Sequence, residues 1–239
     1  MKKKIIVTGG TGRFGNHLKS IITKHKLFFP NKRQFNILNV NSMLKYLKKT
    51  KPDIVIHLAG LSRPMDLHEK DISKSINLNV IGTANVTLAC SNKNIKLIYF
   101  STNYVYPGMN GNYNENDPLK PFNNYAWSKL GGECSVKLYK NSLILRVCMT
   151  EKPFIHKKAF ANVKTSFIYH DEVAKILFKL LNKKGTINIG GKAQYIYNFA
   201  KKENEKVKKI YQKKNFKTKL PFDSTINIKK LEKIIKVKF

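Results

Sequence analysis

A tyrosine and a lysine four residues apart, Tyr125 and Lys129, are the pair in this sequence best suited to chemistry. On a helix, residues four apart share one face, so both side chains can point into one cleft. A free phenol has a pKa near 10 and is a weak acid at neutral pH, but a neighbouring ammonium favours the phenolate and lowers that pKa. The pair therefore predicts a proton donor for a substrate oxygen.

A threonine, Thr102, comes directly after the apolar segment 97–100 and Ser101. Ligands of open α/β sheets bind at the carboxyl ends of the strands, where such a residue would lie. We therefore expect Thr102 to steady the substrate oxygen while Tyr125 donates the proton. A Tyr-x-x-x-Lys spacing occurs often by chance in a chain rich in both residues, so its weight depends on its position after this strand-like segment.

A glycine-rich turn follows the first apolar segment, residues 4–8, and precedes an expected helix. Gly9, Gly12 and Gly15 have the spacing of a dinucleotide-binding turn. Glycines there allow a tight turn and a close approach to a pyrophosphate, while the helix offers free N–H groups to the anion. We predict a nicotinamide cofactor at this turn, with Lys129 bound to its ribose and the phenol giving its proton as hydride arrives.

The end of the second expected strand lacks the acidic residue that usually holds the ribose hydroxyls of NAD. This segment, 27–33, instead ends in Lys32 and Arg33, and the glycine turn contributes Arg13. These cations could receive a 2′-phosphate, which favours NADP(H) as the cofactor. Because basic residues are common throughout the chain, NAD(H) stays the alternative.

Short apolar runs without polar alternation recur between expected helices, which is typical of parallel strands covered on both faces. The runs occupy residues 5–7, 54–58, 97–100 and 143–145, and helices are expected over 12–24, 42–49, 72–91 and 123–138. This order predicts an α/β protein with a Rossmann-like doubly wound parallel sheet. We expect an NADP(H)-binding domain over 1–150 and a small, shortened C-terminal substrate lobe over 151–239, folded back on the sheet.

The composition indicates a strongly basic chain, with 46 Lys and Arg against 14 Asp and Glu and a net charge of +32. Such a charge brings nucleic acid and anionic membranes into consideration. The lysines are spread among many asparagines and isoleucines, so compositional drift is favoured and a nucleic-acid partner is not expected. The histidines and cysteines lack metal-ligand spacing, which predicts no metal. The three cysteines are an odd count, which favours a reducing compartment, so we expect a cytoplasmic location. No apolar segment reaches the roughly 20 residues of a membrane span, so no membrane partner is expected.

Longer motifs surround the single residues. They read STNYVYPG from Ser101, NDP from Asn116, NYAWSKLGGE from Asn124, VIHLAG from Val55, NVIGTAN from Asn79 and FIYHDEVA from Phe167. With these motifs the sequence resembles the extended short-chain dehydrogenases/reductases, and most of all the dTDP-4-dehydrorhamnose reductases. The resemblance covers about the first 200 residues. It implies NADPH-dependent reduction of a 4-keto-6-deoxy nucleotide sugar.

The resemblance also implies roles for further side chains. It assigns cofactor contacts to Gly9, Gly12, Arg13, Phe14, Gly15, Asn36, Ile37, Leu58, Ala59, Gly60, Tyr125 and Lys129. It assigns substrate contacts to Thr102, Asn103, Tyr104 and Arg146. Asn79 matches a helix asparagine of the family, for which we expect a structural duty.

Two departures from the family pattern keep other functions open. Asn103 replaces an acidic residue, and the segment 147–164 is short where the family usually has several tens of residues. The pocket is then either open or completed by a second copy or a partner subunit. The alternatives are a nucleotide-sugar epimerase or dehydratase with bound NAD(P), and a non-catalytic, cofactor-binding regulatory subunit.

Overall fold

The computed structural model describes residues 1–213 and 220–237. The chain forms two compact units, each assembled from separate segments. Unit 1 consists of Met1–Ser101, Asn124–Leu145 and Leu180–Thr186, and unit 2 of Thr102–Asn123, Arg146–Lys179 and Ile187–Phe239.

A six-stranded sheet has the strand order β10-β5-β4-β3-β1-β2. Its strands are β1 (Lys4–Thr8), β2 (Lys26–Phe28), β3 (Ile54–His57), β4 (Lys96–Thr102), β5 (Ser142–Val147) and β10 (Gly185–Ile189). The strand β1 pairs in parallel with both β2 and β3, and β3 pairs in parallel with β4. The predicted Rossmann-like parallel sheet is confirmed. The strand order reverses between β1 and β3, which is where ligands of such sheets bind.

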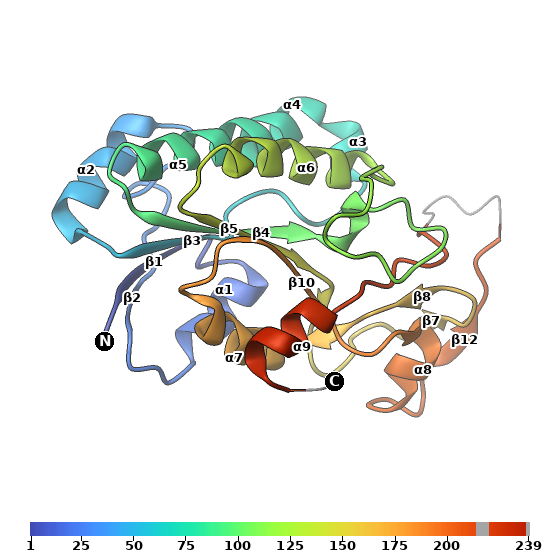
Figure 1. The fold of residues 1–239 in the computed structure, drawn as a ribbon. Coiled ribbons are helices and arrows are strands. Elements are labelled where there is room, and N and C mark those ends of the chain that lie inside the picture. Colours follow the sequence, from blue (N-terminus) through green and yellow to red (C-terminus); the bar gives the residue numbers. More distant parts are fainter. Residues whose placement is uncertain (214–219, 238–239) are drawn as a thin grey trace. The chain divides into compact units, whose positions relative to one another are not determined.

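The apolar runs form the strands because both faces of the sheet in unit 1 are covered by helices. The helices α2 (Val40–Thr50), α5 (Gly82–Ser91) and α6 (Asn124–Lys137) cover one face, and α1 (Arg13–Lys19) lies on the other (Figure 1). Ile5, Ile6 and Val7 of β1 are fully buried between these layers. The expected helix over 72–91 is interrupted, since α4 (Ile72–Ser75) and α5 are joined by a π-helix (Ile76–Ile81). The short helix α3 (Leu67–Lys70) precedes α4.

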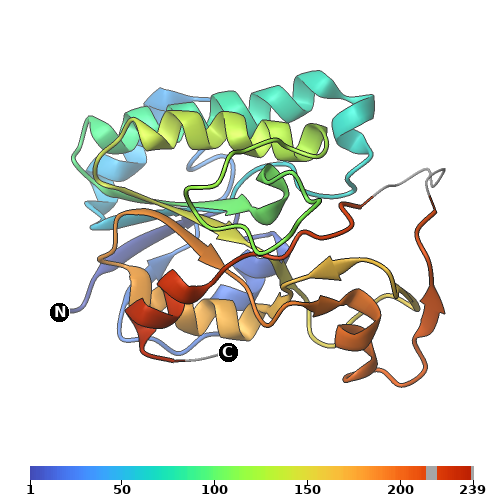
Figure 2. The ribbon, with the colours of Figure 1, turned by 45° about the vertical axis from the view of Figure 1, so that its right-hand side comes forward.

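Unit 2 consists of short elements around its own apolar cluster, in which Phe154, Tyr169 and Phe199 pack together. Its helices are α7 (His170–Leu180), α8 (Ile196–Lys201), α9 (Lys229–Ile235) and a 3₁₀ turn (Asn103–Val105). Its paired strands are β6 (Met149–Thr150) with β9 (Ile168–Tyr169), β7 (Lys158–Phe160) with β12 (Lys208–Ile210), and β8 (Lys164–Thr165) with β11 (Gln194–Tyr195). Figure 2 shows α8 beside β7 and β12.

No helix in the described ranges is long and apolar enough to cross a membrane.

Candidate cofactor and catalytic site

The glycine turn lies between β1 and α1, at the point where the strand order reverses. Gly9 has a φ of +69°, and a Cβ there would lie 2.7 Å from the Ala59 backbone nitrogen. A Cβ on Gly15 would overlap the carbonyl oxygen of Gly9 and lie 2.8 Å from the Gly10 Cα. The Gly12 N–H donates to the Gly9 carbonyl at 2.9 Å and closes the turn. The turn is therefore a tightly packed backbone cradle in which Gly9 and Gly15 leave no room for a Cβ.

A buried histidine, His57, joins the strands on either side of the reversal. The Thr8 hydroxyl accepts from the Leu58 and Ala59 N–H groups at 3.2 and 3.1 Å and lies 2.8 Å from His57 Nδ1. Because that hydroxyl already accepts twice, its proton points at Nδ1, and Nε2–H donates to Thr83 at 3.1 Å. Burial lowers the pKa of His57 to about 3, so the ring is neutral. The sequence indicated a surface or core role for this residue and missed that it fixes segment 58–60.

The segment after β3 is tied in turn to α6 by Asn79. Its Oδ1 accepts from the Leu61 N–H at 2.7 Å, and its Nδ2 donates to the Leu61 carbonyl and to the Ser128 hydroxyl, both at 2.8 Å. The Ser128 hydroxyl donates to the Tyr125 carbonyl at 2.7 Å. The structural duty expected of Asn79 is thus to hold the first turn of α6 against this segment.

Tyr125 and Lys129 both lie on α6, beside the buried Tyr99 of β4. The Lys129 ammonium lies 4.2 Å from the centre of the Tyr99 ring, and the Tyr99 hydroxyl donates to the Lys129 carbonyl at 3.1 Å. The negative charge of a Tyr125 phenolate adds to the causes that raise the pKa of Tyr99, after burial and the Glu133 carboxylate. Burial lowers the pKa of Lys129 to about 7, although Glu133 acts against it. The lysine is therefore close to its titration point at neutral pH, with its cation held over an aromatic face.

This shift predicts a pH-dependent stability. Between pH 7 and the unfolded pKa of 10.5, the unfolded chain binds the Lys129 proton and the folded chain does not, so stability rises with pH. The slope is at most about 1.4 kcal/mol per pH unit and smaller here, because the Lys129 side chain is partly exposed. We expect Lys129→Met to stabilise the protein at pH 7 and to reduce this slope, as measured by urea unfolding at pH 7 and 9.5. An identical slope in both proteins would contradict the assigned burial.

The buried His68 is a site residue that the sequence did not reveal. Its ring meets the Tyr125 ring edge-on, with 5.1 Å between centroids, and its Nδ1 lies 2.7 Å from the Ser75 hydroxyl. Its Nε2 is buried and has no hydrogen-bond partner within the described residues. The pKa of His68 is lowered, chiefly by burial, with the Lys129 charge contributing and Glu69 opposing. No motif marks this position, because the contact depends on how α3 meets α6.

The remaining predicted cofactor residues of unit 1 lie on the segments that follow β1 and β2. The exposed Lys32 and Arg33 follow β2 in a loop that begins at Phe29. The Phe29 ring lies against the turn, since a Cβ on Gly10 would be 3.0 Å from it. Ile37 is buried, and its carbonyl accepts from Asn85 Nδ2 at 3.0 Å. The other members of this set are exposed Arg13, buried Phe14 against Phe100, and half-buried Asn36.

The predicted substrate contacts belong to unit 2. Buried Thr102 ends β4, and its hydroxyl accepts from the Tyr104 N–H at 3.3 Å. Asn103 is buried and donates to the Ser224 carbonyl at 3.0 Å. Arg146 donates to the Tyr106 hydroxyl at 2.9 Å and to the Glu115 carbonyl at 3.2 Å. Asn103 and Arg146 thus both have structural partners inside unit 2.

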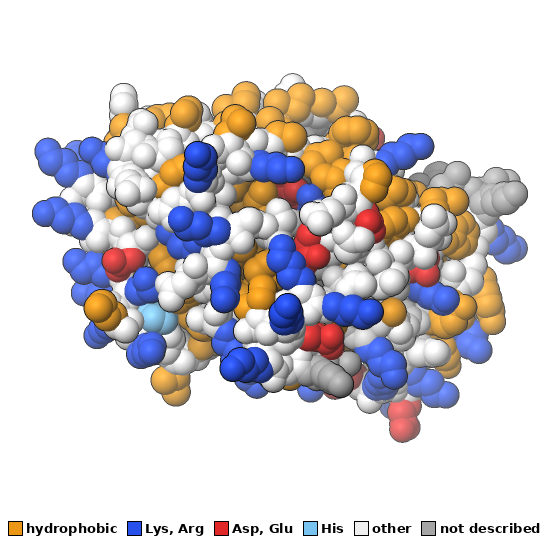
Figure 3. Space-filling view, in the orientation of Figure 1, with side chains coloured by type: hydrophobic (Ala, Val, Ile, Leu, Met, Phe, Trp, Pro, Cys, Tyr) orange, Lys and Arg blue, Asp and Glu red, His pale blue; other side chains and the backbone are white. Residues whose placement is uncertain are grey.

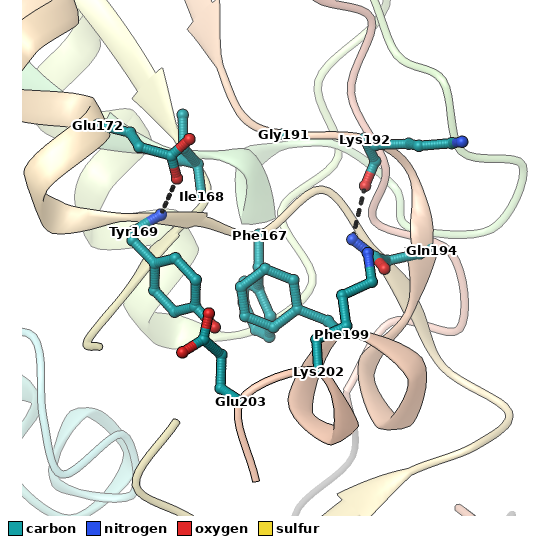
Figure 4. Close-up of a pocket in the computed structure, with 10 residues that line it drawn as sticks. All are labelled: Phe167, Ile168, Tyr169, Glu172, Gly191, Lys192, Gln194, Phe199, Lys202 and Glu203. Carbon is teal, nitrogen blue, oxygen red and sulfur yellow. Dashed lines mark hydrogen bonds between the residues drawn. The ribbon is translucent and has the colours of Figure 1, made fainter. Parts of the chain in front are cut away.

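A hollow of about 240 Å³ lies within unit 2 and contains none of the predicted site residues. Its aromatic walls are Phe167, Tyr169 and Phe199, with 4.9 Å between the last two rings (Figure 4). Glu172, Glu203, Lys192 and Lys202 also line it and add two charges of each sign. None of the residues predicted to bind a cofactor or to act in catalysis lines this hollow. Among the described residues, no cluster of side chains could hold a metal ion.

A glycine cradle at the reversal of a parallel sheet, followed by helices on both faces, defines a Rossmann-like α/β protein of the dinucleotide-binding kind. More specifically, the chain belongs to the RmlD substrate-binding-domain family, whose model matches residues 2–150. The resemblance seen in the motifs is thereby confirmed at the level of the family.

Relatives of different function share this family likeness. A methionine adenosyltransferase 2 subunit beta from Danio rerio is 32% identical over 155 residues, which are 61% of this chain and 47% of that protein. A dTDP-D-glucose 4,6-dehydratase from Dictyostelium discoideum is 30% identical over 237 residues, covering 82% of this chain and 52% of that protein. The chain thus spans about half the length of these curated relatives.

The fold is shared with solved structures. The crystal structure of a dTDP-4-dehydrorhamnose reductase from Bacillus anthracis, in complex with NADP, matches with a TM-score of 0.87 at 22% identity. The match covers 100% of this chain and 93% of that one. The structural likeness thus extends beyond residues 2–150, which the family model matches.

Proposed function

We propose that this chain is an NADP(H)-dependent reductase of a 4-keto-6-deoxy nucleotide sugar, with NAD(H) as the alternative cofactor. The observation that carries the proposal is the placement of Tyr125 and Lys129 on α6 beside Tyr99, with the lysine ammonium 4.2 Å from the centre of the Tyr99 ring. A neighbouring cation is what makes a phenol acidic enough to protonate an alkoxide near neutral pH.

The residues of the glycine turn fit the proposed cofactor. A Cβ on Gly9 or Gly15 would collide with neighbouring backbone atoms, so glycine is needed for the tight turn that brings the backbone close to a pyrophosphate. The turn leads directly into α1, and the amino end of a helix favours an anion such as a pyrophosphate. The bound cofactor would supply hydride to the keto carbon.

The chain's own residues would handle the proton and the charge. As the keto oxygen gains negative charge, the Tyr125 hydroxyl would give it a proton and become a phenolate. The Lys129 ammonium would stabilise that phenolate, and the Tyr99 ring beneath it would keep the lysine in place. The same ammonium would hydrogen-bond the ribose hydroxyls, and Thr102 would steady the substrate oxygen.

The basic loop after β2 predicts a preference for NADPH. We expect Lys32→Ala combined with Arg33→Ala to weaken NADPH binding about 10-fold to 100-fold, because charge-assisted hydrogen bonds to the 2′-phosphate are lost. NADH binding should stay nearly unchanged, since it has no such phosphate. Fluorescence titration with both cofactors checks this, with Lys45→Ala combined with Lys48→Ala on α2 as the matched control. Equal losses for NADPH and NADH would contradict the assignment.

A non-catalytic, cofactor-binding subunit is the second candidate. The identity of 32% to a protein named as a subunit, and the short segment 147–164, favour it. A screen of keto-sugar nucleotides for NADPH oxidation separates the candidates. The reductase predicts turnover of at least one dTDP- or UDP-linked 4-keto-6-deoxy sugar. If the protein bound the cofactor, turned over none of these sugars and had a stoichiometric protein partner, the subunit function would be favoured over the reductase function.

A further inference from the structure

The amino ends of the strands in unit 1 form a lysine-rich edge, which we call the basic edge. Parallel strands begin at the same side of a sheet, so the segments that enter them lie next to one another. The lysines of these segments are Lys2, Lys3, Lys4, Lys24, Lys26, Lys49, Lys51, Lys93, Lys96, Lys140, Lys183 and Lys184.

Backbone hydrogen bonds show that these segments are neighbours. The Lys26 N–H donates to the Lys3 carbonyl at 2.8 Å, and the Asp53 N–H donates to the Lys4 carbonyl at 2.9 Å. The Lys96 N–H donates to the Asp53 carbonyl at 3.3 Å. Two further contacts extend this row of neighbouring segments. The Leu97 N–H donates to the Asn141 carbonyl at 3.1 Å, and Lys96 Nζ donates to the Lys183 carbonyl at 2.6 Å. The basic edge is therefore continuous from β2 to β5, about 20 Å at the usual strand spacing.

The positive charge of this edge is not neutralised locally. Asp53 is the one acidic residue in these segments, and its carboxylate accepts from the Lys4 N–H at 2.7 Å. Burial first, and then the charges of Lys184 and Lys3, lower the pKa of Lys96 to about 8. Figure 3 shows blue side chains along the left margin, where the strands begin. Lys3, Lys96 and Lys184 are thus close enough for their charges to repel one another.

Two exposed aliphatic side chains flank the basic edge. Ile22, in the loop between α1 and β2, is 101% exposed, and Leu138, in the loop between α6 and β5, is 87% exposed. Apart from Met1, these are the most exposed large apolar side chains in the described ranges. The helices that precede these two loops, α1 and α6, lie on opposite faces of the sheet (Figure 1).

This combination fits a lipid surface better than nucleic acid. Arginine forks and stacking aromatic side chains usually add to phosphate contacts in nucleic-acid sites. The basic edge contains no arginine, and the aromatic ring of Tyr139 has its hydroxyl engaged with the Ile95 carbonyl at 2.9 Å. Fully exposed aliphatic residues beside lysines are what an anionic bilayer accommodates, since the lysines meet headgroups and the side chains enter the interface.

Helix termini explain only part of the edge. Lysines near the carboxyl ends of helices are favoured by the helix dipole, as for Lys48 and Lys49 of α2. This effect does not account for Lys2, Lys24 or Lys26, which lie outside helices.

We propose that the basic edge docks on a bilayer that contains anionic lipids, with Ile22 and Leu138 entering the headgroup region. The absence of spanning helices does not bear on such a surface contact. The glycine turn and Tyr125 belong to the opposite, carboxyl end of the strands, so docking leaves them facing away from the lipid. This binding does not depend on the proposed reaction.

Co-sedimentation of the full chain with phosphatidylserine/phosphatidylcholine vesicles tests the proposal at physiological ionic strength. We expect binding to these vesicles and little to pure phosphatidylcholine. Replacing Lys24, Lys140 and Lys184 together by Gln should weaken vesicle binding about 100-fold, because each lysine near an anionic surface contributes about 1 kcal/mol to the binding free energy. The matched control replaces Lys120, Lys157 and Lys206, three exposed lysines of unit 2, by Gln and should change binding less than threefold.

The aliphatic contribution needs a separate variant. Ile22→Ser combined with Leu138→Ser leaves the charge unchanged and should weaken vesicle binding about 10-fold, while Ile72→Ser combined with Ile155→Ser should not. No binding to anionic vesicles, or equal losses in both lysine variants, would overturn the proposal. The proposal would also be overturned if the protein bound single-stranded RNA more tightly than anionic vesicles and the serine variants did not change that binding. Thermal unfolding verifies that each variant is folded.

Discussion

Replacing Tyr125 by phenylalanine is expected to lower kcat by about three orders of magnitude while the affinity for NADPH stays within about twofold. General acid catalysis by a positioned group contributes about 10²-fold to 10⁴-fold, and the variant removes only the hydroxyl that would supply the proton. The ring is retained, so its edge contact with His68 can persist. Steady-state turnover and fluorescence titration of NADPH measure the two quantities.

The matched control for this variant is Trp127→Phe. Trp127 lies on the same helix but is 55% exposed, so its replacement should leave kcat within about twofold. If Tyr125→Phe retained most of its turnover, the proton would have to come from another group. If it lost cofactor binding as strongly as turnover, the role would be structural.

Replacing Gly15 by alanine is expected to weaken NADPH binding about 1,000-fold. The new Cβ would overlap the Gly9 carbonyl oxygen and crowd the Gly10 Cα, and both are backbone atoms that cannot rotate away. The turn would have to shift, and losing two charge-assisted hydrogen bonds of about 2 kcal/mol each gives this factor. The measurement is the dissociation constant for NADPH, taken beside the unfolding temperature.

Gly185→Ala is the control for this second variant. Gly185 also has a positive φ, +84°, but a Cβ there would meet nothing within 4 Å. Its replacement should lower the stability somewhat, because alanine disfavours a positive φ, and should leave the cofactor affinity unchanged. Normal NADPH binding by Gly15→Ala would show that the cradle is not the pyrophosphate site.

Local sequence patterns predicted the parts of the fold that depend on near neighbours. The run Ile5-Ile6-Val7 followed by Gly9 predicted a buried strand and a turn. Both are present, because β1 lies inside the sheet between β3 and β2. The spacing of Tyr125 and Lys129 predicted a shared helix, which is α6. The strand after α1 was harder to predict from an apolar run, because β2 has only three residues and lies at the edge of the sheet.

What the sequence did not reveal depends on contacts between distant segments. His57 and His68 bear no ligand spacing, and their roles arise from packing against Thr8 and Tyr125 respectively. The basic edge was likewise not predicted from the sequence. Lys3, Lys96 and Lys184 are far apart in sequence, and only the parallel sheet brings them together. Twelve of the lysines are therefore gathered at one end of the strands.

The direct test of hydride transfer to a keto carbon uses NADPH carrying deuterium at the transferable C4 position. The protein is incubated with this cofactor and a dTDP-4-keto-6-deoxyhexose, and the product is analysed by mass spectrometry and NMR. A reductase with Tyr125 as its proton donor yields one deuterium at the former keto carbon for each NADPH oxidised. A product that forms without deuterium and without consumption of NADPH would contradict the proposed reaction.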